Sequence, residues 1–286
     1  TGLHPLRGQN NVQGASDAGV IPMFLPDYQS VTDDGVRSAF TEVWQSEDFS
    51  DQKGLTVTEI MDAVHADQIK GMYILGENPA MSDPDVEHAR DALAKLDHLV
   101  VQDIFITETA NYADVILPAS AFYEKSGTVT NTNRQVQMGR PAVAPPGEAR
   151  EDWAITVALA NRMGLQWNYD SPADVFAEMK LNMKSLNNIT WDRLERENAV
   201  TYPCHDPEGP GEAVVFGDGF PRPEGRARFT TASECLGGIK DVKLLGREYA
   251  YIRRYRYPSV VFARNMATMQ TLSQVPKFLV EAVAGG

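Results

Sequence analysis

The sequence predicts a three-layer α/β/α fold around a mainly parallel sheet, and three observations in Gly71–Pro118 support it. Three short apolar runs, Met72–Leu75, Leu99–Val101 and Val115–Leu117, lie beside polar or turn residues and are too short for helices. Apolar residues recur at intervals of three or four over Asp83–Lys95, which is typical of an amphipathic helix. Buried strands that alternate with helices indicate a parallel sheet with both faces covered.

Polar residues and a glycine follow the first two predicted strands. Gly76–Pro79 comes after the first strand, and Gln102–Asp103 comes after the second. Ligands of open α/β sheets bind beyond the carboxyl ends of the strands. Asn78 has paired donors and acceptors that suit the edge of a base, and Gly76 allows a ligand close to the backbone. We therefore expect a nucleotide-type ligand, although helix capping also explains these residues and the glycine fingerprint for phosphate is incomplete.

Length, charge and hydropathy limit the possible functions. The chain of 286 residues suggests one large or two modest domains, and its hydrophobic fraction of 43% is sufficient for a core. The net charge of −13 argues against nucleic acid as the main partner. We find no signal peptide and no apolar run long enough for a membrane span, and we expect a cytoplasmic protein.

Cysteine usage gives no sign of a metal centre within this chain. Cys204 and Cys235 are the only cysteines, and they are too far apart for the CxxC spacing of zinc or iron–sulfur ligands. Two isolated cysteines imply no disulfide framework, and a reducing compartment fits. We predict no metal ligand among the residues present.

The opening segment, residues 1–30, is rich in Gly, Asn, Gln and Pro and holds few charges. Uncharged amides and glycines around Arg7 suggest the wall of a pocket. Arginine can hold a carboxylate or phosphate through two parallel hydrogen bonds, which lysine cannot do. The alternative is a structural arginine paired with Asp17. The residues alone leave both interpretations open.

Residues 31–233 form the predicted α/β domain. Beyond the central stretch, further helices are expected over Thr32–Trp44, Thr58–Ala66, Asp152–Met163, Asp174–Met183 and Trp191–Asn198. Thr58 is the expected N-cap of the second of these helices. Alternating residues over Thr128–Thr132 and Gln135–Met138 predict a hairpin.

Residues 234–286 differ in charge from the rest of the chain. They hold 8 Lys and Arg against 4 Asp and Glu, whereas the preceding residues hold 18 against 35. We expect this basic tail to be poorly ordered.

Several motifs carry a resemblance to a known family. They are Pro5–Ala15 (PLRGQNNVQGA), Gly76–Pro79 (GENP), Val101–Phe105 (VQDIF), Ala113–Pro118 (ADVILP) and Gly127–Thr132 (GTVTNT). Together they resemble molybdenum-dependent formate dehydrogenases of the molybdopterin oxidoreductase, or dimethyl sulfoxide reductase, family. The likeness is greatest to the catalytic α subunit of NAD-dependent formate dehydrogenases. It extends over about residues 1–230, and the RGQNNVQG string is specific to the formate branch.

This resemblance implies a cofactor, a substrate and partners. The cofactor is bis(molybdopterin guanine dinucleotide) with molybdenum or tungsten, and the sheet is its Rossmann-like binding domain. Formate is oxidised to carbon dioxide, and iron–sulfur and flavin subunits pass the electrons to NAD. The [4Fe–4S] clusters and the terminal barrel of the family are expected only in parts of the parent protein that this chain lacks. The isolated chain is therefore expected to be inactive, and its exposed face to be apolar.

The resemblance also assigns site residues. Arg7 holds the formate carboxylate, and Gln9 lies close to the same site. The cofactor-binding residues are Gly76, Glu77, Asn78, Pro79, Gln102, Asp103, Thr107, Asp114, Gly127, Asn131 and Arg134.

Two alternatives share the same scaffold. One is a non-catalytic structural domain like that of the large iron–sulfur subunit of respiratory complex I. The intact RGQNNVQG string argues against it, because a structural domain has no need of a carboxylate clamp. The other is a nitrate-reductase-like molybdoenzyme, which would share the later motifs but not that string.

Overall fold

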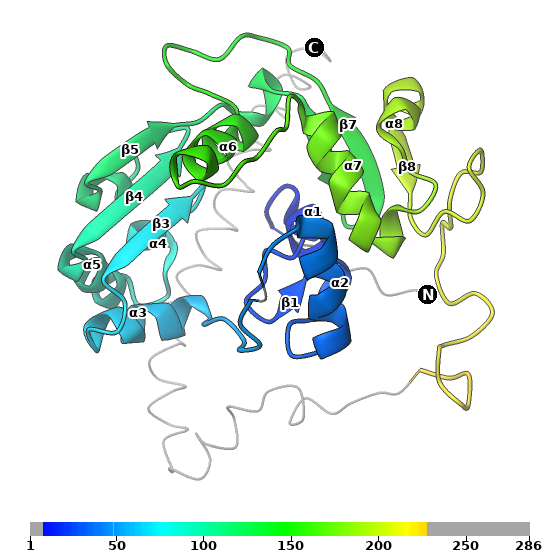
Figure 1. The fold of residues 1–286 in the computed structure, drawn as a ribbon, viewed down its shortest axis with the longest axis horizontal. Helices are drawn as coiled ribbons and strands as arrows, with labels where there is room; N and C mark the ends of the chain where they lie inside the picture. The colour runs from blue at the N-terminus through cyan, green and yellow to red at the C-terminus, as the bar shows by residue number, and fades with distance from the viewer. Residues whose placement is uncertain (1–7, 48, 228–286) are drawn as a thin grey trace, which may run out of the picture. The chain divides into compact units, whose positions relative to one another are not determined.

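The computed structural model describes residues 8–47 and 49–227. The chain divides into two compact units, Thr1–Gly217 and Asp218–Gly286. Residues 218–227 are the described part of the second unit and form bends and turns. The expected domain boundary at residue 233 and the basic tail lie outside the described residues. The first unit contains every element discussed below (Figure 1).

The strands of the described residues form three sheets. They are β1 (Phe24–Leu25), β2 (Gln29–Ser30), β3 (Gly71–Leu75), β4 (His98–Asp103), β5 (Val115–Pro118), β6 (Gly127–Thr130), β7 (Gln135–Gly139) and β8 (Ala199–Thr201). Strands β3, β4 and β5 form a parallel sheet in that order, which confirms the prediction. The expected hairpin is β6–β7, and β8 joins it as a third antiparallel strand that the sequence did not reveal.

The predicted helices are present, with ends shifted by a few residues. The α-helices are α1 (Val12–Asp17), α2 (Asp34–Trp44), α3 (Val57–His65), α4 (Pro79–Ser82), α5 (Val86–Lys95), α6 (Asp152–Arg162), α7 (Pro172–Asn182) and α8 (Trp191–Glu197). Single 3₁₀ turns are η1 (Pro26–Tyr28), η2 (Thr109–Tyr112), η3 (Phe122–Glu124) and η4 (Lys184–Leu186). The N-cap of α3 is Thr56 rather than Thr58, because Glu59 reaches back and accepts from the Thr56 N–H at 2.8 Å. None of the described helices is long and apolar enough to cross a membrane.

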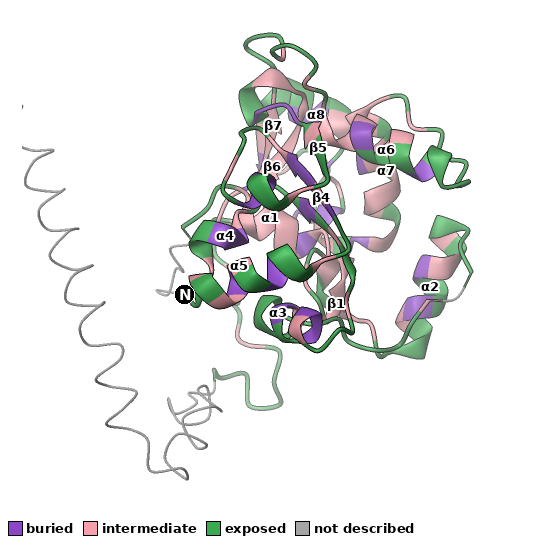
Figure 2. Ribbon diagram, turned by 90° about the vertical axis from the view of Figure 1, so that its left-hand side faces the viewer, coloured by how far each residue is buried: buried purple, intermediate pink, exposed green. Residues whose placement is uncertain are grey.

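The parallel sheet lies between helices, as the three-layer prediction requires. Ile74, Leu99 and Val101 point to one face and pack with Leu93 of α5 in a buried cluster. Figure 2 shows buried residues along β4 and on the inner side of α5. The opposite face meets α6 through a hydrogen bond between Gln102 and Asp152 at 2.7 Å. Helix α6 therefore lies on one face of the sheet, and α5 lies on the other.

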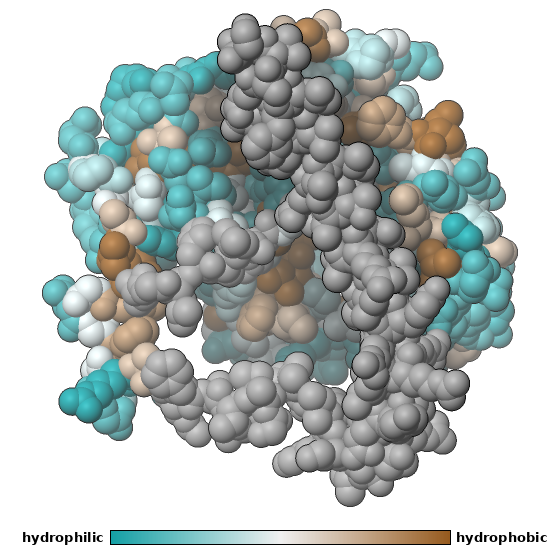
Figure 3. All heavy atoms as spheres, turned by 180° about the vertical axis from the view of Figure 1, so that it is seen from behind, coloured by the Kyte–Doolittle hydropathy of each residue, from teal (hydrophilic) through white to brown (hydrophobic). Residues whose placement is uncertain are grey.

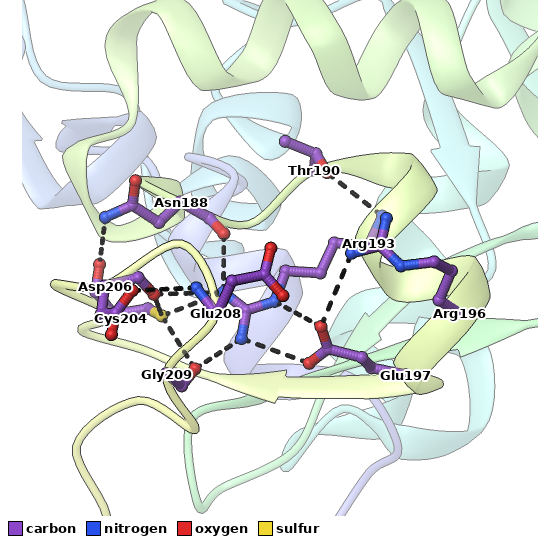
Figure 4. A network of polar contacts seen from close by, with 9 residues as sticks. All are labelled: Asn188, Thr190, Arg193, Arg196, Glu197, Cys204, Asp206, Glu208 and Gly209. Carbon is purple, nitrogen blue, oxygen red and sulfur yellow. Dashed lines mark hydrogen bonds and ion pairs between the residues drawn. The ribbon is translucent and has the colours of Figure 1, made fainter.

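A second core lies under the antiparallel sheet. Val136 and Val200 of β7 and β8 pack with buried side chains of α7 and α8. Arg193 of α8 is only 3% exposed and binds Glu197 through Nε at 2.9 Å. Figure 4 shows its guanidinium surrounded by acceptors on the segment that follows β8. Arg193 therefore ties this segment to α8.

Candidate functional site

The loops at the carboxyl edge of the parallel sheet bring several predicted residues together. Gly76 directly follows β3 with a φ of 65°, which favours glycine, and a Cβ added there would meet no atom within 4 Å. Its N–H donates to the Gln102 carbonyl of β4 at 2.9 Å. Glu77 beside it is exposed, and Asp103 ends the neighbouring strand. Gly76 and Glu77 therefore leave this edge exposed to solvent.

Asn78 joins the loops that follow β3 and β4. Its Oδ1 accepts from Thr109 through the N–H at 3.1 Å and the hydroxyl at 2.7 Å. Its Nδ2 donates to Glu108 at 2.7 Å, and this hydrogen bond holds the pKa of Glu108 below its usual value. The Asn78 amide is thus used to fix the two loops. Pro79 is buried as the first residue of α4, and Thr107 caps the η2 turn through Ala110 N–H at 3.3 Å.

Gln102 lies beneath this edge instead of on it. It is fully buried, and its amide accepts from the Tyr73 hydroxyl and donates to Asp152. Asp152 also binds Lys125, which precedes β6. Burial, together with the charge of Asp152, raises the pKa of Tyr73. Gln102 therefore supports the loops from below and links the parallel sheet to the hairpin.

Asp114 does not join the other predicted residues. It precedes β5, and its Oδ2 accepts from the Leu99 N–H at 2.7 Å near the start of β4. In a parallel sheet this is the end opposite to the carboxyl edge. The structure gives Asp114 a role in aligning two strands, because its carboxylate extends the ladder between them.

The amide-rich string packs against the hairpin. Asn11 precedes α1 in a left-handed conformation, and its Oδ1 accepts from the Thr130 N–H at 2.8 Å. Gly14 allows this approach, since a Cβ there would lie 2.1 Å from Asn11 Oδ1 and 3.1 Å from Thr130 N. The close contact between the string and β6 therefore requires a residue without a Cβ at position 14. Gly8 and Gln9 are exposed at its beginning, and Arg7 lies outside the described residues.

Replacing Gly14 with alanine should lower the free energy of unfolding by about 1–3 kcal/mol, because the added methyl group displaces Asn11 from Thr130. Alanine normally stabilises a helix relative to glycine. A lower free energy of unfolding would therefore show that the steric clash outweighs this helix preference. Urea denaturation of the 286-residue chain measures the change. Gly8→Ala is the matched control, since its Cβ would meet nothing within 4 Å. Equal stability of both variants would contradict the prediction.

A buried carboxylate holds the other end of α1. Asp17 is 5% exposed, and its Oδ2 accepts from the Tyr202 hydroxyl at 2.7 Å. Its Oδ1 accepts from Gln13 Nε2 at 2.6 Å, and Gln13 also donates to Tyr28 at 3.2 Å. Burial raises the pKa of Asp17, against these hydrogen bonds, and burial also raises the pKa of Tyr202. The hydrogen-bond partners of Asp17 among the described residues are therefore Tyr202, Gln13 and Tyr28.

The predicted hairpin residues shape the turn and its surroundings. Asn131 Oδ1 accepts from the N–H groups of Asn133 and Gln135, at 2.9 and 3.1 Å. Arg134 has a φ of 64°, and its Nη2 donates to the Glu212 carbonyl at 2.9 Å. Gly127 begins β6, and a Cβ there would meet nothing within 4 Å. The polar groups of Asn131 and Arg134 thus form hydrogen bonds within the fold, whereas no atom lies close to the position of a Cβ at Gly127.

Apolar side chains extend beside the carboxyl edge. Ile104, Phe105 and Ile106 follow β4 in sequence and are 48%, 72% and 78% exposed. Hydrophobic residues also reach the surface at several separate places on the face seen from behind (Figure 3). Among the residues that the structure describes, no three His, Cys, Asp or Glu side chains gather as a metal site would require. The edge therefore offers apolar surface and isolated polar groups.

Sequence reasoning missed four residues of these networks, namely Gln13, Lys125, Asp152 and Tyr202. Gln13 lies within the motif Pro5–Ala15, and Lys125 lies shortly before the motif Gly127–Thr132. Their proximity to these motifs was the signal that could have identified them. Tyr202 had no such signal, because its partner Asp17 is 185 residues away in the chain.

Comparisons with known proteins give a family model, two curated relatives and one solved structure. A family model described as molybdopterin oxidoreductase matches residues 6–162. The F420-dependent formate dehydrogenase subunit alpha of Methanocaldococcus jannaschii is 47% identical over 230 residues, covering 80% of this chain and 33% of the relative. The F420-dependent formate dehydrogenase 2 subunit alpha of Methanococcus maripaludis is 39% identical over 272 residues, covering 94% of this chain and 39% of the relative. Acetylene hydratase from Pelobacter acetylenicus, a solved structure, matches 71% of this chain and 28% of its own with a TM-score of 0.45 and 22% identity.

The coverage of these matches has two consequences. The chain spans between a third and two fifths of the length of the two curated relatives. The alignment with the Methanococcus maripaludis protein covers 94% of the chain and so extends past residue 233, which corrects the expectation that resemblance ends near residue 230. Since the family model matches more than half of the sequence, the chain belongs to the molybdopterin oxidoreductase family.

Proposed function

We propose that this chain is the part of a formate dehydrogenase alpha subunit that holds one molybdopterin guanine dinucleotide and carries the substrate string. The observation behind the proposal is the 47% identity to a formate dehydrogenase alpha subunit over 80% of the chain. The RGQNNVQG string lies within residues 6–162, which the molybdopterin oxidoreductase family model matches. The complete protein oxidises formate to carbon dioxide, which releases two electrons and a proton.

The guanine dinucleotide is proposed to bind at the carboxyl edge of the parallel sheet. Gly76 leaves open space at the end of β3, and Ile104–Ile106 provide apolar surface for a planar ring. Asp103 Oδ1 accepts from the Ile104 N–H at 2.6 Å, and the described residues form no hydrogen bond to Oδ2. This oxygen is available to the N–H groups of a base or a pterin. Glu77, Thr107 and Gly127 complete the proposed binding residues, whereas Asn78 and Gln102 support them.

The proposed substrate residues are Arg7 and Gln9. The planar guanidinium of Arg7 holds the formate carboxylate through two parallel hydrogen bonds and so orients its C–H bond. The exposed amide of Gln9 is available to the same substrate. When bound, the molybdenum or tungsten cofactor supplies the two-electron redox chemistry, and the protein supplies position and electrostatic field.

The electron acceptor that we propose differs from the sequence-based expectation. Both relatives described above are named F420-dependent, and neither name mentions NAD. We therefore propose F420 as the acceptor, reached through partner subunits. The full-length protein should oxidise formate with F420 and leave nitrate unchanged. Nitrate reduction without formate oxidation would contradict the proposal, whereas NAD reduction would restore the expected acceptor.

Asp103→Asn in the full-length protein should lower the amount of bound cofactor, because a charged hydrogen bond to the ligand is lost. Such bonds contribute about 1.5–3 kcal/mol, so we expect about a tenfold or larger loss of affinity. Asparagine can still cap Ile104 through its Oδ1, which preserves the loop. Molybdenum or tungsten content per protein is the measurement. Asp97→Asn, an exposed aspartate before β4, is the matched control, and equal losses in both variants would contradict the assignment.

A further inference from the structure

Helix α1 depends on contacts with distant parts of the chain. It contains six residues, and a helix of this length is unstable in isolation. The Asn11–Thr130 hydrogen bond holds its beginning, and the Asp17–Tyr202 hydrogen bond holds its end. Gly8–Asn10 immediately precede the helix. The position of these residues is therefore set from β6 and from the segment after β8.

Tyr202 is itself fixed by the hairpin turn. Its N–H donates to the Arg134 carbonyl at 3.0 Å, and the Arg134 guanidinium donates to the Tyr202 carbonyl. The Tyr202 hydroxyl then donates to Asp17. These contacts form a continuous series from the turn of the hairpin to the last residue of α1.

Asp17, at the end of this series, is a buried acidic residue, so losing its hydrogen bond to Tyr202 is costly. The Asp17 carboxylate is 5% exposed, Tyr202 and Gln13 donate to its separate oxygens, and Tyr28 is a further hydrogen-bond partner. Without the Tyr202 hydroxyl, this buried carboxylate loses its hydrogen bond to the segment after β8, so α1 is expected to shift toward solvent. A shift of 1 Å in a substrate-holding group can slow a reaction by about 100-fold.

We propose that Tyr202, held by Arg134 and bonded to Asp17, is a positioning residue for the substrate string. This inference rests on the proposed function, in which the string holds formate. It also changes the expected role of Arg134, which holds Tyr202 in place instead of contacting the cofactor.

The first test uses the 286-residue chain and needs no cofactor. Tyr202→Phe keeps the ring and removes the hydroxyl, so amide hydrogen exchange should become faster in residues 8–17 and stay unchanged in β3–β5. Tyr169→Phe is the matched control. Tyr169 lies in the segment before α7, and its hydroxyl also donates to a carboxylate, that of Glu178 at 2.7 Å. Unchanged exchange in residues 8–17 of Tyr202→Phe would overturn the inference.

The second test uses the full-length, cofactor-loaded protein. Tyr202→Phe should raise the KM for formate about tenfold, the size expected for one hydrogen bond to a charged group, with metal content unchanged. A purely structural role would lower the metal content and leave KM and kcat per metal unchanged, and that result would overturn the inference. Should the wild-type protein fail to oxidise formate, the proposed function fails, and hydrogen exchange alone then decides whether Tyr202 holds the string.

Discussion

Arg193→Met should lower the free energy of unfolding by about 2–4 kcal/mol, because several partly buried carbonyls lose a charged donor. The Arg193 side chain is 3% exposed and pairs with Glu197. Its Nη1 also donates to the Asn188 carbonyl at 3.0 Å. Methionine fills similar volume but leaves these partly buried carbonyls without their donor, whereas Glu197 is 35% exposed and keeps Arg196 at 3.9 Å. A shift in the urea midpoint, followed by circular dichroism, measures the loss.

Arg196→Ala is the matched control for this prediction. Arg196 lies 3.9 Å from the same Glu197, but its side chain is 60% exposed. Exposed ion pairs contribute about 0–1 kcal/mol, so this variant should unfold near the wild-type midpoint. Arg193→Lys should lie between the two, because lysine keeps the charge but cannot reach several acceptors at once. Similar midpoints for Arg193→Met and Arg196→Ala would refute the interpretation.

Arg7→Lys should reduce kcat/KM for formate in the full-length protein by a factor on the order of 10²–10³, as removal of a single well-placed donor does elsewhere. Lysine keeps the positive charge but not the two parallel hydrogen bonds that orient a carboxylate. The loss should therefore appear even when the cofactor content is normal. Steady-state formate oxidation, expressed per bound metal, is the measurement.

The control for Arg7 is Arg162→Lys, an exposed arginine at the end of α6. Arg162→Lys should leave formate oxidation unchanged, because Arg162 is not among the proposed substrate residues. If Arg7→Lys retains wild-type kcat/KM, the alternative interpretation of Arg7 as a structural arginine gains support.

Local pattern was sufficient to predict the layers of the fold. The apolar spacing in Asp83–Lys95 predicted both the helix and the face that packs on the sheet, and Ala89 and Leu93 are buried there. The third strand of the antiparallel sheet was missed, because Ala199–Thr201 is too short to show an alternating pattern. Its pairing with Gln135–Gly139 depends on residues far away in the chain.

The candidate site was predicted in part. The motif at Gly76 and the end of β4 at Asp103 meet at one edge of the sheet, as the rule for parallel strands implies. Asp114 belongs to a matching motif, but it lies at the other end of the sheet. A motif identifies residues that a family shares without stating whether they contact a ligand or align strands.

By itself, the sequence determined the alternation of strands and helices, the family and the string that begins at Arg7. These features depend on short-range spacing and on residue types that can be read along the chain. Only the tertiary structure decided that Gln102 turns inward, that Arg134 holds Tyr202 and that Tyr202 binds Asp17. Such pairings join residues that are distant in sequence, and burial alone makes them specific, because a buried polar group must find a partner wherever the fold supplies one.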